Sequence, residues 1–253
     1  MEPRTLPEVV TALDAIVRHC EQTRHRAGYF AALYKRMTEA VAAGIAAGAF
    51  EDGPRMEQLD VVFAWRYLRA WQAHGRRAAC PAAWQHAFDG CPNPALVVLQ
   101  HLLLGINAHI NLDLAVAAAT VAPGPRIHAL ETDFNRINAV ISALFDDVQQ
   151  CLEQVWRPMR WLSRVAATQQ TDVLNFSIGA ARRAAWANAV LLASLPPDRR
   201  PAHIGGMDAT VHRLGQRIAQ PGPWPAAVLR LVRLTEYEDV ARTIRLIETT
   251  RVG

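Results

Sequence analysis

The stretch GINAHINLDLAVAAA, residues 105–119, is apolar along most of its length, yet polar side chains interrupt it at four positions. Apolar residues recur on both sides of the stretch, and together they predict one helix over 94–121. A helix that is hydrophobic all round must be covered by other elements on every side. We therefore expect a helical bundle with this segment at its centre.

The rest of the chain shows the same helical spacing of apolar residues, with no convincing strand alternation. Turn-forming combinations of proline with glycine or asparagine separate the segments, as in CPNP at 91–94 and APGPR at 122–126. The predicted fold is an all-α, single-domain multi-helix bundle that covers 1–253. Its expected helices run through 7–23, 27–48, 55–75, 94–121, 128–156, 170–195, 206–219 and 225–249.

The composition limits the class of protein. The chain has 253 residues, of which 51% are hydrophobic, so it can bury a large core. Its start carries acidic residues early and lacks the uninterrupted apolar run of a secretory signal. Polar residues interrupt the apolar region 95–121, so a membrane span is not expected. These patterns predict a cytoplasmic protein without a membrane partner.

The cysteines and the basic residues argue against two further classes. The four cysteines form no C-x-x-C pair of the kind that zinc ribbons and thioredoxin-like sites use. The net charge is +4, but the arginines are dispersed and have no interleaved aromatic residues. We therefore expect reduced, structural cysteines and no nucleic acid as a partner.

The polar residues of the central helix fall on two of its faces. His109 and Asp113 are four residues apart, so they share one face. Gln100, Asn107 and Asn111 cluster on nearly the opposite face. The two stripes therefore face different neighbours, and the amides of the second stripe are expected to tie helices together.

Two more of the predicted helices carry a carboxylate inside an apolar stripe. Asp60 lies in the middle of the apolar arc of 55–75, and Asp133 falls in the core stripe of 128–156. A lone buried carboxylate is costly unless it is paired, hydrogen-bonded, protonated or bound to a metal. The simplest hypothesis is that both aspartates converge on the His–Asp pair of the central helix.

Such a cluster of Asp60, His109, Asp113 and Asp133 is suited to two kinds of chemistry. Carboxylate oxygens and one imidazole are ligands that can hold a divalent metal ion. Alternatively, clustered carboxylates shift one another's pKa values and provide a general acid beside a general base. In that mechanism His109 would move a proton and Asp113 would orient it. Asp60 and Asp133 would stabilise developing positive charge or hold the cation.

A purely structural role is the other interpretation of the same residues. His109 is then a core histidine bonded to a neighbouring carboxylate or a backbone carbonyl. The aspartates pair with Arg66, Arg136 or Arg182 inside the bundle. In this case the cluster is satisfied by the protein itself and needs no ligand.

A small-molecule ligand would need further side chains at the cluster. Tyr67 and Asn138 lie nearby on the two helices that carry the aspartates. Asn175, Arg182 and Trp186 share one face of an otherwise alanine-rich helix and are expected to line a cavity. The expected site is an interhelical pocket for a small, mainly apolar molecule.

Around LLLGINAHINLDLAVA, residues 102–117, the chain resembles a bacterial all-helical family, domain-of-unknown-function family 5995, whose signature is similar to G-x-N-A-H-I-x-x-D-L. The chain departs from the family at Arg26 and Ala27, where members often have an acidic residue. The resemblance implies an all-helical single domain and adds Tyr34 to the candidate ligand-binding residues, but it implies no reaction. The matching positions are Tyr34, Thr38, Asp60, Arg66, Tyr67, Asn107, His109, Asp113, Asp133 and Asn138.

Two classes of function follow from these patterns. The first is an enzyme that acts on a small, mainly apolar molecule by acid–base or metal-assisted chemistry at the Asp/His cluster. The second is a non-catalytic small-molecule-binding or interaction protein whose Asp, His and Asn side chains form a buried network. The segment 227–248 has the pattern of an amphipathic packing or dimerisation helix, so a homodimer is also considered.

Overall fold

The computed structural model describes residues 2–137, 178–236 and 239–249. These residues form helices joined by short turns and contain no strand, which confirms the predicted all-α bundle. The predictions for Asn138 and Asn175, for most of 128–156 and for the start of 170–195 lie outside the described residues. The helices are α1 (Leu6–Thr23), α2 (Ala27–Ala46), α3 (Gly53–Gly75), α4 (Ala82–Asp89), α5 (Val98–Ala108), the π-helical turn η1 (His109–Asp113), α6 (Leu114–Val121), the 3-10 turn η2 (Gly124–Leu130), α10 (Ile178–Ser194), α11 (Arg200–Ala219), α12 (Pro223–Thr235) and α13 (Val240–Thr249).

Side-chain caps define where two of these helices begin. Thr5 precedes α1, and its hydroxyl accepts a hydrogen bond from the Glu8 amide at 3.4 Å. Asp52 precedes α3, and its carboxylate accepts a hydrogen bond from the Arg55 amide at 3.0 Å. Both helices also have proline in the first turn. The N–H groups of the first turn have no partner within the helix, so proline, which lacks an N–H, breaks no helical hydrogen bond there. These signals lie in the local sequence, which is why both starts are close to the predicted ones.

The central helix runs without a break through α5, η1 and α6, from Val98 to Val121. By length and composition alone this helix could cross a membrane, but its most apolar window is 78% buried inside the protein. The core helix of a bundle passes the same test. The π-helical turn at His109–Asp113 is the one irregularity along this helix, and it carries the His–Asp pair.

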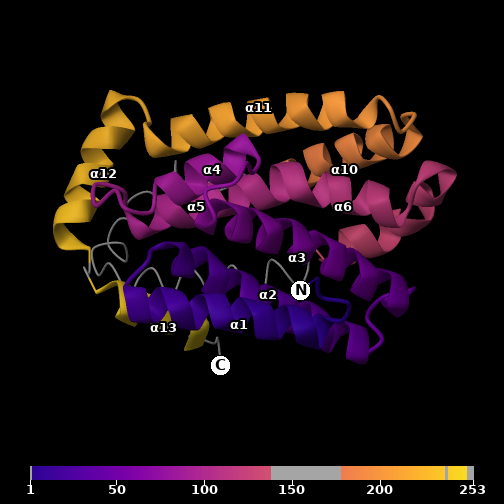
Figure 1. Ribbon diagram of the computed structural model, residues 1–253, viewed down its shortest axis with the longest axis horizontal. Coiled ribbons are helices and arrows are strands. Elements are labelled where there is room, and N and C mark those ends of the chain that lie inside the picture. Colours follow the sequence, from indigo (N-terminus) through magenta and orange to yellow (C-terminus); the bar gives the residue numbers. More distant parts are fainter. Residues whose placement is uncertain (1, 138–177, 237–238, 250–253) are drawn as a thin grey trace, which may run out of the picture.

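Other helices cover the central helix above and below (Figure 1). In that view α10 and α11 lie above it and α2 and α3 lie below it, and all four contact it. α1 and α13 pack against α2, so the first and last helices of the chain share one layer. α12 connects the α11 layer to the α13 layer at one end of the bundle. The central, covered position predicted for this helix is confirmed.

The C-terminal region differs from the prediction of one helix over 225–249. The structure has two helices, α12 and α13, and between them Glu236 adopts an extended backbone with φ −75° and ψ 144°. Its carboxylate turns inward and accepts hydrogen bonds from the Val98 amide at 3.0 and 3.2 Å. Glu236 therefore caps the start of the central helix, and this long-range contact is not visible in the local apolar pattern.

Gly105 allows α2 and α5 to approach closely. A Cβ atom at this position would lie 2.4 Å from Cγ of Phe30. The Phe30 ring is buried and meets the rings of Tyr67 and Trp84, with centroid distances of 5.3 and 5.5 Å. It is therefore enclosed by other aromatic side chains and has little room to move aside.

Replacing Gly105 by alanine is expected to lower the free energy of unfolding by about 1 to 3 kcal/mol. Alanine favours a helix over glycine by up to about 1 kcal/mol, but the overlap with Phe30 outweighs this gain. Gly205→Ala in α11 is the matched control, because nothing lies within 4 Å of its added Cβ. Urea denaturation of both variants provides the measurement. Equal stability of the two variants would contradict the close approach at Gly105.

Candidate functional site

A single buried carboxylate joins three helical elements at the middle of the central helix. Asp113 accepts hydrogen bonds from Nε of Arg66 at 2.8 Å and from Nε1 of Trp84 at 2.7 Å. Its Oδ2 also lies 3.2 Å from Nδ1 of His109. Since Asp113 is 1% exposed, these contacts replace water around the carboxylate. The arrangement fixes α3, α4 and the π-helical turn relative to one another.

The His109 ring is held in one orientation by its neighbours. Phe63 stacks on it, with ring centroids 3.6 Å apart and an interplanar angle of 8°. Tyr34 meets it edge-on, with the centroids 4.3 Å apart. Burial lowers the pKa of His109, although the Asp113 carboxylate opposes this effect. A neutral ring that donates its Nδ1 proton to Asp113 keeps a free, basic lone pair on Nε2.

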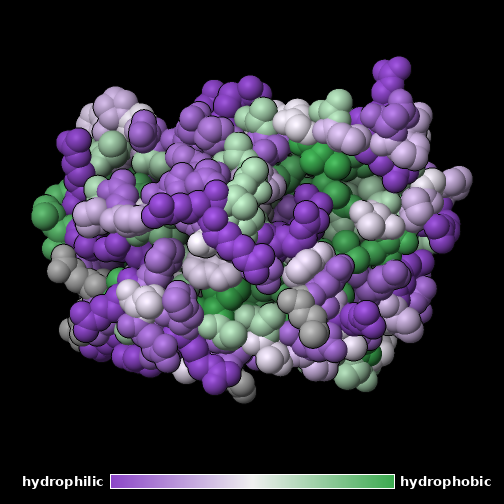
Figure 2. Space-filling view, in the orientation of Figure 1, coloured by the Kyte–Doolittle hydropathy of each residue, from purple (hydrophilic) through white to green (hydrophobic). Residues whose placement is uncertain are grey.

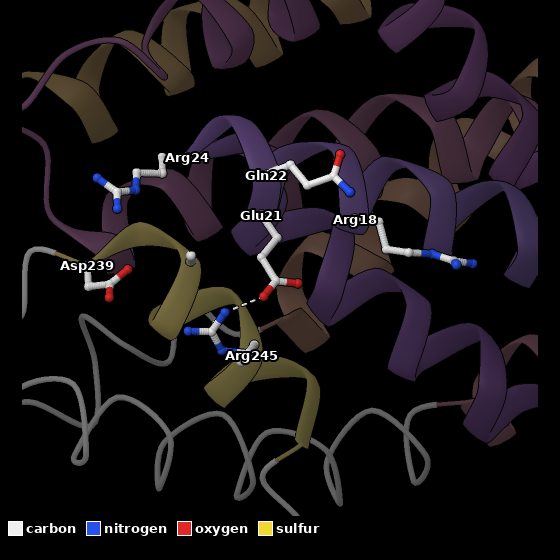
Figure 3. Close-up of a pocket in the computed structure, with 7 residues that line it drawn as sticks. Arg18, Glu21, Gln22, Arg24, Asp239 and Arg245 are labelled. Carbon is white, nitrogen blue, oxygen red and sulfur yellow. Dashed lines mark hydrogen bonds and ion pairs between the residues drawn. The ribbon is translucent and has the colours of Figure 1, made fainter.

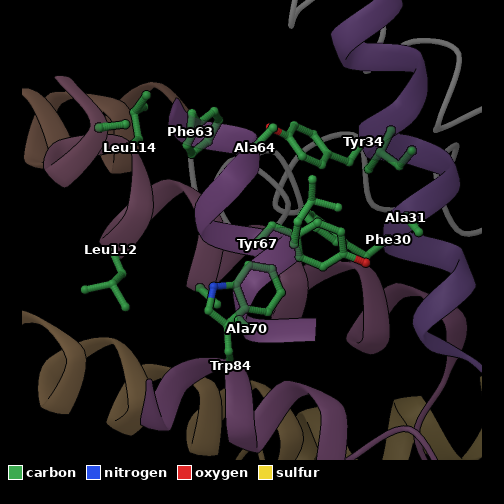
Figure 4. Packing of buried hydrophobic residues seen from close by; sticks show 14 of the residues in the cluster. Phe30, Ala31, Tyr34, Phe63, Ala64, Tyr67, Ala70, Trp84, Leu112 and Leu114 are labelled. Atoms are coloured by element: carbon green, nitrogen blue, oxygen red, sulfur yellow. The ribbon is translucent and has the colours of Figure 1, made fainter. Parts of the chain in front are cut away.

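Several buried polar atoms on α2, α3 and the π-helical turn have no hydrogen-bond partner of good geometry among the described residues. The Tyr34 ring contacts His109 and also meets the Tyr67 ring at 5.9 Å between centroids. Figure 4 shows Tyr34 on the side of Phe63 and Tyr67 next to Trp84. A buried polar group without a partner costs about 1 to 3 kcal/mol. Among these atoms are Oδ2 of Asp60, Nε2 of His109 and the Tyr67 hydroxyl, whereas the hydroxyls of Tyr34 and Thr38 have each other, in a contact that lowers the pKa of Tyr34.

Asp60 and Tyr34 are electrostatically coupled within this cluster. Burial raises the pKa of Asp60 to about 7. Burial also raises the pKa of Tyr34 well above its ordinary value, and the nearby carboxylates of Asp60 and Asp113 raise it further. At neutral pH the cluster therefore holds a neutral phenol and a carboxyl group that is close to its point of half-protonation.

A family of unknown function, DUF5995, matches residues 6–221 of the chain. The chain belongs to this family. No curated protein and no solved structure matches the chain. The part of the chain that matches DUF5995 contains the Asp/His cluster and the helices from α1 to α11, whereas α12 and α13 follow it.

Asp133, the remaining carboxylate of the predicted cluster, has a different set of partners in this DUF5995 chain. It accepts hydrogen bonds from the amides of Glu51 and Asp52 at 2.8 and 2.9 Å. It also pairs with Arg55 at 3.3 Å and with Arg136 at 3.4 Å. Asp133 thus anchors the turn before α3. The interpretation in which aspartates pair with arginines is confirmed for Asp133 with Arg136, and for Asp113 with Arg66.

The ligand set suggested for a divalent metal ion does not form in the described part of the chain. No three His, Cys, Asp or Glu side chains there are placed to hold a metal ion. The reason is visible in the contacts of two of the four candidates. Arg66, Trp84 and His109 occupy the carboxylate of Asp113, and backbone amides with arginines occupy that of Asp133.

Asp133→Asn is expected to lower the free energy of unfolding by about 1 to 3 kcal/mol at neutral pH, because the arginines lose their anion. Burial alone would raise the pKa of Asp133, but the amides of Glu51 and Asp52 and the Arg55 guanidinium lower it below its ordinary value. A depressed pKa gives stability that is present above the unfolded value of about 3.9 and is lost as the pH falls through the folded value. The free energies of unfolding of the wild type and Asp133→Asn, measured by denaturation, should therefore converge below about pH 4. A difference in stability between the two proteins that does not change with pH would contradict this role of Asp133.

The second polar stripe of the central helix faces α11, whereas Asp113 on the first stripe bonds to α3 and α4, so the two stripes face different neighbours as predicted. The Asn107 side chain donates to the Val211 carbonyl at 2.9 Å, and Asn111 donates to Asn107 at 3.0 Å. The Gln100 side chain donates to the Ile218 carbonyl at 2.8 Å. These amides tie α11 to α5, which confirms the structural role expected for them.

Arg182 and Trp186 lie together on α10, at a distance in sequence from the Asp/His cluster. Arg182 is 3% exposed, donates a hydrogen bond to the Phe134 carbonyl and lies 4.5 Å from the centroid of the Phe134 ring. Burial lowers the pKa of Arg182 to about 10. The Trp186 ring packs against Phe134, with centroids 4.8 Å apart. The contacts of this pair join α10 to the helical residues 131–137.

A surface pocket of about 580 Å³ lies between α1 and α13, where Arg245 pairs with Glu21 (Figure 3). It is lined by charges of both signs and is separate from the Asp/His cluster. Its lining residues are Arg18, Glu21, Gln22, Arg24, Asp239, Ala241 and Arg245.

Sequence reasoning missed two parts of the cluster. Trp84 lies on α4, a helix of eight residues that is too short to show a clear apolar period. Phe63 belongs to the apolar arc of 55–75, and that pattern indicates a core position but not the stacking on His109 that the structure shows. The spacing of three residues between Asp60 and Phe63 was a usable signal, since it places both on one face of α3.

Proposed function

We propose that the protein is an enzyme that transfers a proton to and from a small, mainly apolar molecule at the Asp/His cluster. The observation that carries this proposal is that two buried, unpartnered polar atoms, Nε2 of His109 and Oδ2 of Asp60, are linked by Tyr34, which contacts the His109 ring and is electrostatically coupled to Asp60. Native proteins leave few such groups, and a concentration of them calls for a specific reason. A ligand with one or two oxygen functions would supply the missing hydrogen bonds.

His109 is the general base in this proposal. Its Nδ1 faces Asp113, which orients the ring and stabilises the imidazolium that forms when Nε2 accepts a proton. Asp113 itself is a positioning residue, because Arg66 and Trp84 hold its carboxylate in place. A base that is neutral before the reaction is ready to accept the proton at physiological pH.

Asp60 is the proton donor. A pKa of about 7 leaves much of this carboxyl group protonated at neutral pH, which suits a general acid. Tyr34 contacts the His109 ring, and the charge of Asp60 adds to the rise in the Tyr34 pKa that burial causes. The aromatic rings of Phe30, Phe63 and Trp84 would provide the apolar walls.

The π-helical turn supports a functional interpretation of this place in the fold. The turn begins at His109, the general base, and ends at Asp113, the residue that positions it. A π-helical turn is less stable than regular α-helix and is found often at functional sites. An ordinary core helix would have no need of one in the middle of its most buried segment.

Deuterium exchange tests this proposal on many candidate substrates at once. A panel of small ketones and phenols is incubated with the protein in D₂O, and ¹H NMR follows the loss of carbon-bound protons. Exchange catalysed by the wild-type protein should fall by about 100-fold or more in His109→Gln. His101→Gln is the matched control, since His101 is also buried on the central helix and has unpartnered ring nitrogens. Exchange that is retained in His109→Gln would contradict the assigned base.

A non-catalytic network is the second candidate function, and the close packing of the His109 ring favours it. Phe63 and Tyr34 contact both the face and the edge of this ring. In that case the cluster fixes the register of α2 and α3 against the central helix. A His109→Gln protein that loses its cooperative unfolding while the panel shows no exchange would support this candidate.

A further inference from the structure

Two histidine rings meet where α4 packs against α11, and neither belongs to the Asp/His cluster. The centroids of the His86 and His212 rings are 5.3 Å apart, with an interplanar angle of 59°. Both residues are partly exposed. The surface over α4 is mostly hydrophilic on the face that Figure 2 shows. An ion from solvent therefore has no broad apolar layer to cross on its way to the pair.

The orientation of the His86 ring turns one of its nitrogens towards α11. A Cβ atom added at Gly215 of α11 would lie 3.1 Å from Cδ2 of His86, so this edge of the ring faces α11. Nε2 is bonded to Cδ2 within the imidazole ring and lies on the same edge. It is buried and has no hydrogen-bond partner of good geometry in the part of the chain that the structure describes. His212 lies three residues before Gly215 and so shares its face of α11, which places it on the side that Nε2 faces.

Metal binding requires a neutral imidazole, because a protonated ring has no free lone pair. Burial lowers the pKa of His86, and the nearby His212 ring lowers it further. A contact with the Gly215 backbone and the charge of Asp89 oppose this shift only in part. His86 is therefore neutral at pH 7, and on binding a metal ion its ring would give up the contact with the Gly215 backbone.

The separation of the two rings fits a pair of imidazoles bound to one ion. A zinc–nitrogen bond is about 2.0 to 2.1 Å long and the centroid of an imidazole lies about 1.2 Å behind its nitrogen, so each centroid would lie about 3.2 Å from the ion. Two such centroids are about 5.2 Å apart when the nitrogens subtend a tetrahedral angle at the ion. The 5.3 Å between the centroids of His86 and His212 agrees with this distance.

The neighbouring carboxylates have other partners, so they do not enlarge the pair to a site with three ligands. Asp208, one turn before His212, accepts hydrogen bonds from two backbone amides at the start of α4, at 2.7 and 2.9 Å. Asp89, one turn after His86, bonds to His74 at 3.0 Å. Accordingly, no group of three ligating side chains forms within the described ranges. The two imidazoles would leave two positions of a tetrahedral ion to water.

We propose that His86 and His212 together bind one divalent transition-metal ion of the kind that imidazole prefers, such as Zn²⁺, with water in the remaining positions. The ion would fix α4 to α11. The helix α4 also carries Trp84, whose indole N–H donates to Asp113, so the ion would support the helix that holds this carboxylate. The metal site shares no residue with the Asp/His cluster, and the proposal is independent of the chemistry proposed there.

Calorimetric titration of the full-length protein, without an affinity tag, with Zn²⁺ tests the proposal. The wild-type protein should bind one equivalent, and the affinity of His212→Gln should be lower by about 10-fold or more. His203→Gln is the matched control, because His203 lies on the same helix but bonds to Asn188. The affinity of this control should equal that of the wild type. NMR spectra of the histidine ring nitrogens identify the ligands, since Zn²⁺ should shift the signals of His86 and His212.

Three results would overturn the proposal. The first is a wild-type protein that does not bind Zn²⁺ in the titration. The second is a His212→Gln variant that folds, as circular dichroism would show, and binds Zn²⁺ like the wild type. The third is a set of ring-nitrogen shifts confined to other histidines, since the ion would then be held elsewhere. The NMR measurement uses the wild-type protein, so it decides the question even if His212→Gln does not fold.

Discussion

Asp113→Asn is expected to lower the free energy of unfolding by about 3 kcal/mol. The substitution removes the negative charge that pairs with Arg66 and leaves a largely buried guanidinium without its counter-ion. It also replaces one of the two oxygens that accept hydrogen bonds from Arg66 and Trp84. Breaking a buried pair from one side costs more than the pair contributes, because the remaining charge stays desolvated.

The measurement is urea denaturation of Asp113→Asn, Arg66→Met and the double variant. If the two side chains act through one contact, the double variant should be more stable than the sum of the single effects predicts. Asp14→Asn is the matched control, since Asp14 pairs with Arg18 and Lys35 near the surface and should cost less than about 1 kcal/mol. A loss at Asp113 no larger than the loss at Asp14 would be inconsistent with its central position.

The contacts of Asp113 show how far the sequence predicts this site. The i, i+4 spacing correctly placed His109 and Asp113 on one face of the central helix, since helical geometry is local. Arg66 was expected as a partner of a buried aspartate, because a carboxylate in an apolar helix needs a cation. Trp84 was not expected, since α4 contributes a single indole N–H from a short helix. Partners that depend on tertiary packing leave no periodic signal.

For Asp133 the sequence predicts the burial of the side chain but not its hydrogen-bond partners. Its position in an apolar stripe correctly indicated a buried carboxylate, but two of its partners are the backbone amides of Glu51 and Asp52. Every residue except proline has an amide, so the sequence cannot distinguish these donors from any others. The same holds for Glu236, whose carboxylate caps the Val98 amide and divides a segment that its apolar pattern predicts as one helix.

Asp60→Asn is expected to stabilise the protein at pH 8, by about 3 kcal/mol relative to the wild type. Burial raises the pKa of Asp60 to about 7, whereas an unfolded chain ionises near pH 4. Between these values the folded state binds a proton that the unfolded state has released. The contribution of a raised carboxyl pKa is therefore complete below about pH 4 and is lost as the pH rises to about 7. Asparagine resembles the protonated acid and carries no charge to desolvate.

Unfolding curves of wild type and Asp60→Asn between pH 4 and pH 8 measure this difference directly. The two proteins should be nearly equal in stability at the acidic end, and the variant should become the more stable one as the pH rises. Glu236 also has a pKa raised by burial to about 7, but it is present in both proteins and cancels in the comparison. A variant that is less stable at every pH would show that the Asp60 carboxylate has a stabilising partner.

The same variant separates the two proposed functions, because they predict opposite combinations of stability and activity. A structural network is expected to weaken when one of its polar members is replaced. A general acid that is buried without a partner imposes a cost on the folded state, and its removal should stabilise the protein while abolishing proton transfer. Asp60→Asn should therefore gain stability at pH 8 and lose the exchange seen in D₂O. Greater stability with unchanged exchange would remove Asp60 from the mechanism and leave His109 to act without it.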